Sequence, residues 1–365
     1  MARKKGDGSL RALVIRFRRV GDAVLAVAAC SSLKRSFPDI RVDFVLNEAI
    51  APLFEGHPDI DRVVTFTDTD NANPWRYVRR VFEVMRKTRY DILIDMRATP
   101  RTLLFSLFSL RTPFRIGTRK RYSRLLHNYR VADRINPSLD MVQRDLLLLS
   151  PLERLGPLRL DPTFRLYVSD ADRATYRAYM EGKGVDFTKP IVLAAVATRI
   201  EGKGWEMERM VGVLRHIIDT FHPQIILNHS GYRELEISLM LYERMDYDPH
   251  ILPEIEATTL RELRALTSLC DFFFGNEGGP RHIAQALDTP SYAIYPPGIS
   301  RQLWLPGDSP RHRGISPDDI TPPSPTATRA ERFDLVTVDR VWSDLEPMMR
   351  EYLGCASVAS GLWPG

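Results

Sequence analysis

The chain has 365 residues, of which 44% are hydrophobic and 27% are charged; this is the composition of a soluble globular protein with about two domains of ordinary size. No run approaches the roughly 18 apolar residues that a membrane-spanning helix needs. The first residues are polar and basic, so we expect no secretory signal. The three cysteines, Cys30, Cys270 and Cys355, are scattered. They predict neither a disulfide framework nor a metal cluster, and they favour a reducing cytosol.

Strands and helices are expected to alternate along the first part of the chain. Apolar, often β-branched runs predict strands at 12–17, 42–46, 62–66, 91–96 and 114–118. Helical periodicity predicts helices at 23–37, 50–55, 74–87, 100–110 and 141–155. Because no hairpin signals separate the strands, we expect a parallel, doubly wound sheet.

The alternation restarts after a joint near 162–170. Strands are predicted at 191–196, 224–228, 250–252, 272–274 and 291–295. Helices are predicted at 170–183, 206–221, 232–245, 259–270, 281–287 and 338–353, and the Pro/Ser/Thr-rich segment 321–327 is predicted to be a loop. We therefore expect an α/β protein with two Rossmann-like domains, at 1–168 and 169–345, followed by a helix end and tail at 346–365. Two such domains should form a cleft, and ligands should bind beyond the carboxyl ends of the strands.

The most informative stretch is 271–287. An apolar strand at 272–274 precedes a glycine-rich turn that contains Gly278 and Gly279, and a helix follows. Free backbone N–H groups and the positive end of the helix dipole would make an anion site there. An ordinary strand-to-helix turn would explain the glycines alone. Glu277 and His282 flank the same turn, and this favours a ligand site.

Three other polar clusters follow predicted strands. Asp22 stands at a helix start, where a plain capping or first-turn acid would also explain it. Thr198 and Lys203 belong to a loop that is otherwise interpreted as solvated, and Glu234 and Glu236 open a helix on which surface acids are common. No glycine-rich dinucleotide motif follows a strand, no P-loop motif occurs, and no Cys/His spacing suits zinc.

A basic stretch runs from Arg97 to Arg130, with nine Arg or Lys residues and no Asp or Glu. Such a stretch is usually a solvated face, but it can also bind phosphate, an acidic sugar, a lipid headgroup or nucleic acid. No interleaved aromatic platform supports nucleic acid, so we expect no nucleic-acid partner. The apolar residues 103–110 could touch a membrane, although a helix packed on the sheet explains them as well.

At these motifs the chain resembles the heptosyltransferase family of bacterial lipopolysaccharide synthesis, which are ADP-heptose-dependent glycosyltransferases. The resemblance rests on the opening IRFRRVGDAVL at 15–25, YDILIDMR at 90–97, RIG at 115–117, KGW at 203–205 and NEGGPRH at 276–282. The last of these is similar to the family's Asp-x-Gly-x-x-His signature. The resemblance implies a GT-B fold, with the acceptor in the first domain and the nucleotide sugar in the second. It also implies an inverting transfer that needs no metal or other cofactor.

The resemblance also assigns roles to residues. Asp22 matches the family's general base, Lys203 its phosphate-binding lysine, and Thr198 a threonine slightly earlier in the same loop. The ribose-binding glutamate falls at Glu234 or Glu236. The nucleotide-sugar signature carries over to Glu277, Gly278, Gly279 and His282. Two departures bear on the donor sugar, because the family's signature aspartate is a glutamate here and the usual small hydroxyl residue after it is a glycine.

We therefore expect a cytoplasmic glycosyltransferase that moves a heptose or related sugar from an ADP-sugar to an anionic glycolipid, with peripheral contact with the inner membrane. The expected acceptor-binding residues are Arg16, Arg19, Arg97 and Arg101. Lys203 and the helix start would stabilise the leaving diphosphate. If Asp22 proves to be only a helix-start acid, Asp95 and Glu277 are the next candidates for the base. The alternative is a non-catalytic nucleotide-sugar-binding protein of the same fold.

Overall fold

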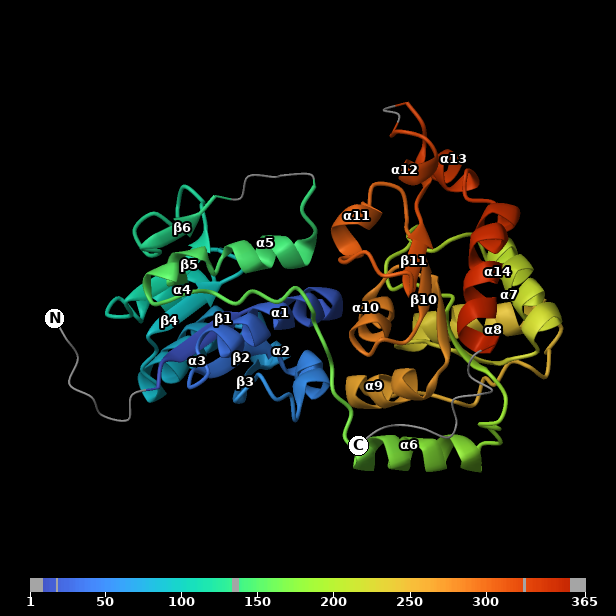
Figure 1. Ribbon diagram of the computed structural model, residues 1–365, viewed down its shortest axis with the longest axis horizontal. Helices are drawn as coiled ribbons and strands as arrows, with labels where there is room; N and C mark the ends of the chain where they lie inside the picture. The colour runs from blue at the N-terminus through green and yellow to red at the C-terminus, as the bar shows by residue number, and fades with distance from the viewer. Residues whose placement is uncertain (1–8, 18, 133–137, 324–325, 355–365) are drawn as a thin grey trace. The chain divides into compact units, whose positions relative to one another are not determined.

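The computed structural model describes residues 9–17, 19–132, 138–323 and 326–354. The chain divides into two compact units, Met1–Tyr167 and Val168–Gly365 (Figure 1). Each unit is built on its own parallel β-sheet with helices packed against it. Cys30 and Cys270 are buried free thiols, and Cys355 lies outside the described residues.

The first unit contains a six-stranded sheet in the order β3-β2-β1-β4-β5-β6. Its strands are β1 (Arg11–Ile15), β2 (Arg41–Asn47), β3 (Arg62–Phe66), β4 (Ile92–Asp95), β5 (Phe114–Thr118) and β6 (Tyr129–Val131). All neighbouring strands are parallel, as the missing hairpin signals predicted. The strand order reverses between β1 and β4, and ligands of open α/β sheets bind outside such a reversal.

The helices of the first unit pack against its sheet in two groups. They are α1 (Val20–Ser36), η1 (Glu48–Phe54), α2 (Asp68–Ala72), α3 (Pro74–Lys87), α4 (Leu103–Leu107), α5 (Met141–Leu147) and η2 (Ser150–Arg154). Apolar side chains of α3 and α4 form one core cluster with the sheet, while α1 packs against α5. The helix predicted at 141–155 is wrong as one element, because Pro151 has no N–H to continue the ladder and the chain restarts as a short 3-10 turn.

The second unit contains a five-stranded parallel sheet in the order β11-β10-β9-β7-β8. Its strands are β7 (Ile191–Ala195), β8 (Gln224–Leu227), β9 (Phe272–Asn276), β10 (Ser291–Ile294) and β11 (His312–Ile315). The strand predicted at 250–252 is reduced to a single bridge between Ile225 and Ile251. The strand order reverses between β7 and β9, so the loops after these two strands meet at the position where ligands are expected.

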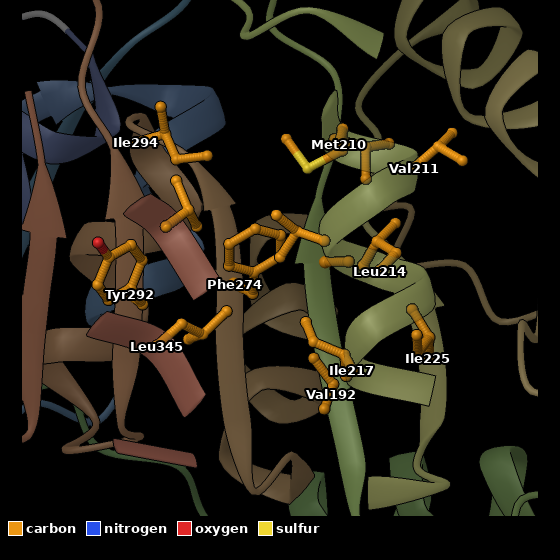
Figure 2. Packing of buried hydrophobic residues seen from close by; sticks show 14 of the residues in the cluster. Val192, Met210, Val211, Leu214, Ile217, Ile225, Phe274, Tyr292, Ile294 and Leu345 are labelled. Atoms are coloured by element: carbon orange, nitrogen blue, oxygen red, sulfur yellow. The ribbon is translucent and has the colours of Figure 1, made fainter. Parts of the chain in front are cut away.

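The helices of the second unit are α6 (Asp170–Gly182), α7 (Met207–Phe221), α8 (Tyr232–Arg244), α9 (Leu260–Leu269), α10 (Gly279–Ala286), α11 (Arg301–Trp304), α12 (Pro317–Ile320), α13 (Arg329–Asp334) and α14 (Val338–Gly354). Figure 2 shows how Leu214 and Ile217 of α7 and Leu345 of α14 pack against Phe274 and Tyr292 of the sheet. This buried cluster fixes the strands, and with them the loops at their carboxyl ends. Among the described residues, no helix combines the length and the apolar character required to cross a membrane.

Candidate functional site

Arg16 is the centre of the polar cluster in the first unit. It follows β1 directly and is only 4% exposed. Its Nη2 donates to Oδ1 of Asp22 at 2.9 Å, and its Nη1 donates to Oδ1 of Asp145 at 3.4 Å and to the carbonyl of Met96 at 3.2 Å. One buried guanidinium therefore joins β1, α1, α5 and the end of β4. Removing it would leave buried carboxylate charge without compensation.

Asp22 lies in the first turn of α1, which begins two residues before it, at Val20. The helix predicted at 23–37 therefore begins earlier than expected and includes Asp22, which is a first-turn acid of α1. Arg19 is the N-cap residue and makes no side-chain capping bond. The positive end of the helix dipole favours a carboxylate at Asp22. The side chain is 12% exposed, so it reaches the surface of the unit while Arg16 holds one of its oxygens.

Asp145 is a site residue that we did not predict from the sequence. It is buried on α5, and its Oδ2 has no hydrogen-bond partner among the described residues. Burial raises the pKa of Asp145 to about 6; Arg16 opposes this rise, and the charge of Asp22 adds to it. A signal for it does exist in the sequence, because Asp145 shares the helical stripe of the buried residues Val142 and Leu146. An acid on such a stripe needs a buried partner.

The buried Asp95 holds the loop that follows β4. Its Oδ1 accepts hydrogen bonds from the N–H groups of Arg97 at 3.0 Å and Ala98 at 2.8 Å. The imidazole Nε2 of His127 lies 3.6 Å from the other oxygen, and the ring occupies the space where a side chain on Gly117 would stand. Asp95 has no exposed surface. It is therefore a poor candidate for a base that must touch an acceptor.

The other predicted acceptor-binding arginines follow the strands around the point of reversal. Arg19 is exposed at the start of α1, and Arg97 is half-buried and donates to the carbonyl of Phe17 at 3.4 Å. Arg101 is exposed and donates to the carbonyl of Asn71 at 2.8 Å, while its guanidinium lies 4.2 Å from the ring centroid of Tyr77. Arg19, Arg97 and Arg101 thus lie, like Arg16, after the carboxyl ends of β1 and β4. Their positive charge suits an anionic ligand.

In the second unit, Glu277 and His282 meet at the turn between β9 and α10. His282 Nε2 lies 3.6 Å from Glu277 Oε1, and both side chains are largely buried. Burial raises the pKa of Glu277, but His282, Arg281 and Lys203 together lower it by more than burial raises it. The pKa of Glu277 therefore lies below its usual range. Glu277 is therefore ionised at neutral pH. Gly278 precedes α10, which begins at Gly279, so the backbone N–H groups of the first helical turn are available to an anion.

Asn276 joins this turn to the loop after β7. It is buried, its Oδ1 accepts the N–H of Trp205 at 2.8 Å, and its Nδ2 donates to the carbonyls of Ala195 at 3.2 Å and Val196 at 2.9 Å. Gly275 precedes it with φ of +144°, and a Cβ there would lie 2.4 Å from the carbonyl oxygen of Ala195. Only glycine allows β9 to approach β7 this closely. Sequence reasoning placed Asn276 in the motif but did not find this role.

Lys203 and Thr198 belong to the loop that Asn276 holds. Lys203 is half-buried and close enough to Glu277 to lower its pKa. The hydroxyl of Thr198 donates to the carbonyl of Ile200 at 2.9 Å. The loop borders a pocket of about 150 Å³ that is lined by both apolar and polar residues. Its lining includes Thr198, Glu201, Trp205, Met210, Arg233 and Leu241.

The two candidate glutamates of α8 differ in their surroundings. Glu234 is buried, and its Oε2 accepts the N–H of Ser230 at 2.6 Å. Burial raises the pKa of Glu234, and Arg199, His229 and the Ser230 N–H oppose this rise only in part. Glu236 is exposed. Glu234 is thus the carboxyl group that faces the loops at the strand ends. No cluster of three or more His, Cys, Asp or Glu side chains in the described ranges could hold a metal ion.

With this geometry established, comparison with known proteins identifies the family. The family model described as glycosyltransferase family 9 (heptosyltransferase) matches residues 78–316. The chain belongs to glycosyltransferase family 9. It is therefore a glycosyltransferase, and the expected family is confirmed. The matched region contains the whole site of the second unit, and it begins after the segment that carries Asp22.

Individual relatives agree with this assignment. The lipopolysaccharide core heptosyltransferase OpsX of Haemophilus influenzae is 25% identical over 289 residues, which cover 77% of this chain and 78% of that protein. Lipopolysaccharide heptosyltransferase 3 of Escherichia coli is 22% identical and covers 75% of this chain and 80% of its own length.

Among solved structures, a family 9 glycosyltransferase from Veillonella parvula has a TM-score of 0.77 at 17% identity, covering 94% of this chain and 98% of that chain. The E. coli ADP-heptose lipopolysaccharide heptosyltransferase II has a TM-score of 0.73 at 20% identity, covering 94% and 99%. The expected GT-B fold is confirmed.

Proposed function

We propose that the protein transfers a heptose from ADP-heptose to a lipopolysaccharide core or a related anionic glycolipid, with inversion at the anomeric carbon. The observation that carries this proposal is the cluster of charged groups at the turn between β9 and α10 of the second unit. There, Lys203, His282 and the start of α10 surround the ionised Glu277 in a family 9 chain. The relatives are lipopolysaccharide heptosyltransferases by name, and the similar E. coli enzyme WaaC was solved with ADP and with ADP-2-deoxy-2-fluoro heptose.

In this proposal the second unit binds the donor. Lys203 and the N–H groups at Gly278 and Gly279 bind the diphosphate, since a cation and a helix N-terminus both favour phosphate oxygens. Glu234 accepts a hydrogen bond from a ribose hydroxyl, and Glu277 accepts one from the transferred sugar. As the glycosidic bond breaks, its electron pair passes to the diphosphate. Positive groups already in place stabilise that charge without reorganisation.

The first unit supplies the base and binds the acceptor. The acceptor hydroxyl oxygen forms the new bond to the anomeric carbon, and its proton passes to Asp22. Arg16 holds the Asp22 carboxylate in one orientation, and Arg19, Arg97 and Arg101 bind phosphate or acidic groups of the acceptor. ADP leaves as the second product. Attack on the face opposite to the leaving group inverts the configuration, so the base and the diphosphate act on opposite sides of the sugar.

We propose a cytoplasmic enzyme that works at the inner membrane, because its acceptor would be a glycolipid and its donor a water-soluble nucleotide sugar. The mild positive charge of the chain, +5 in total, favours approach to anionic lipids.

The test is a coupled assay for ADP on the purified protein. ADP-heptose with a heptose-deficient lipopolysaccharide core should give ADP at a rate that depends on the acceptor. UDP- and GDP-linked sugars serve as matched controls and should give no nucleoside diphosphate. If calorimetry detects ADP-heptose binding but no core acceptor elicits ADP, the protein is a nucleotide-sugar-binding protein and the proposal fails.

A further inference from the structure

The first unit carries large apolar side chains on its surface that its own fold does not bury. On α3, Trp75 is 83% exposed and Phe82 is 45% exposed. On α4 and directly after it, Leu107 and Leu110 are 44% and 57% exposed, and in the loop after β5, Leu125 is 88% exposed. Single exposed apolar residues are ordinary, but a group of five on neighbouring elements marks an interaction site.

Contacts between the elements that carry these residues bring them into one region of the surface of the first unit. The rings of Phe82 and Phe108 are in edge-to-face contact, with centroids 5.5 Å apart, and they join α3 to the end of α4. The guanidinium of Arg115 donates to the carbonyl of Leu110 at 2.8 Å and to that of Leu126 at 2.8 Å. It therefore holds the end of α4 next to the loop that carries Leu125. Trp75 lies seven residues before Phe82 on α3, two turns away on the same helical stripe.

Exposed cations surround the apolar residues. On α3 they are Arg76, Arg79, Arg86 and Lys87, and around α4 and the following loop they are Arg111, Arg121 and Arg124. The acid of this helix face, Glu83, is within salt-bridge distance of Arg79 and Arg80. A second copy of the chain would bring these arginines against one another. A lipid surface with anionic headgroups would instead pair with the cations and take up the leucines and aromatic rings.

We propose that this surface, formed by Trp75, Phe82, Leu107, Leu110 and Leu125 with the surrounding arginines, docks the first unit on a membrane of anionic phospholipids. The apolar side chains enter the headgroup boundary, and the arginines contact lipid phosphates. Trp75 is suited to this position because an indole ring combines an apolar body with a polar N–H group. The docking serves the proposed function by bringing the enzyme to a membrane-borne acceptor, but it does not depend on the identity of the donor.

The test is vesicle flotation of the full chain. The parent protein should float with vesicles of phosphatidylethanolamine and phosphatidylglycerol, and it should remain unbound with phosphatidylcholine alone. The double variant Leu110→Glu/Leu125→Glu should bind the anionic vesicles at least about tenfold more weakly. Two apolar side chains that would insert are then replaced by negative charges, which the anionic headgroups repel. The matched control Leu239→Glu/Met240→Glu changes two exposed apolar residues of α8, which are 48% and 50% exposed, and should bind as the parent does.

The electrostatic part is tested by Arg121→Gln/Arg124→Gln, which should weaken binding to anionic vesicles and flatten its dependence on salt. ADP release with a lipid-free core oligosaccharide should be the same in parent and Leu110→Glu/Leu125→Glu proteins, which shows that the variant is folded and separates docking from catalysis. Equal flotation of parent and leucine variant would overturn the proposal. So would a dimer of the parent in sedimentation that the leucine variant dissociates, because the surface would then bind a second copy.

Discussion

The buried carboxyl group of Asp145 makes the stability of the first unit depend on pH in a way that one substitution can remove. Burial raises the pKa of Asp145 from 3.8 to about 6. The folded protein therefore keeps a proton through a range of pH in which the unfolded chain has already released it. Stability must fall as pH rises through this window, and the loss is complete above the folded pKa.

The size of the effect follows from the shift. A change from 3.8 to about 6 corresponds to a total loss of about 3 kcal/mol of unfolding free energy, of which about half falls between pH 5 and pH 7.5. Asp145→Asn keeps the size of the side chain and abolishes its titration. Relative to the parent, the variant should therefore gain about 1.5 kcal/mol of stability as pH rises over this range.

Urea denaturation of both proteins at several pH values measures this difference, since titrations common to both cancel. The matched control is Asp39→Asn, which removes an exposed aspartate of the same unit and leaves the buried carboxyl group of Asp145 in place. If the difference in unfolding free energy between the parent and Asp145→Asn does not change with pH, the argument that burial raises the pKa of this carboxyl group is refuted.

Three further predictions concern the donor site. Lys203→Ala should weaken ADP-sugar binding in calorimetry by about 2 kcal/mol, the cost of a lost charge-assisted hydrogen bond, whereas the exposed control Lys189→Ala should not; equal affinities would remove Lys203 from the site. Glu234→Gln should weaken donor binding more than Glu236→Gln, because only Glu234 is buried beside the strand ends, and the reverse order would exchange their roles. Turnover should persist in EDTA, and loss that magnesium restores would contradict a metal-independent transfer.

Much of the fold could be predicted because it is encoded by local patterns. The strand at 62–66 and the helix at 74–87 agree with β3 and α3 residue by residue, since β-branched runs and helical periodicity are strong there. The short β6 was missed because its three residues are all only half-buried and show no clear pattern. The strand prediction at 250–252 was wrong because this segment pairs with β8 through only one bridge, between Ile251 and Ile225.

The candidate site was predicted unevenly, for a physical reason. Glu277 and His282 are close in sequence, so one turn brings them together. Arg16 and Asp145 are 129 residues apart, and their contact depends on how α5 packs beside α1. Likewise, the hydrogen bond between Asn276 and Trp205 in the loop after β7 forms only because β9 and β7 are neighbours in the sheet. Such pairings are properties of the tertiary fold, and a pass along the sequence contains no signal for them.

The most direct test of the proposed mechanism is the turnover of Asp22→Asn with saturating ADP-heptose and core acceptor, measured as ADP release. Asparagine keeps the shape of the side chain and cannot take the acceptor proton, and loss of a general base typically costs about 10² to 10⁴ in rate. We expect a fall of that order, with donor affinity nearly unchanged because the donor binds to the second unit. Turnover within a few-fold of the parent would show that Asp22 is only a first-turn acid of α1 and that the proposed base is wrong.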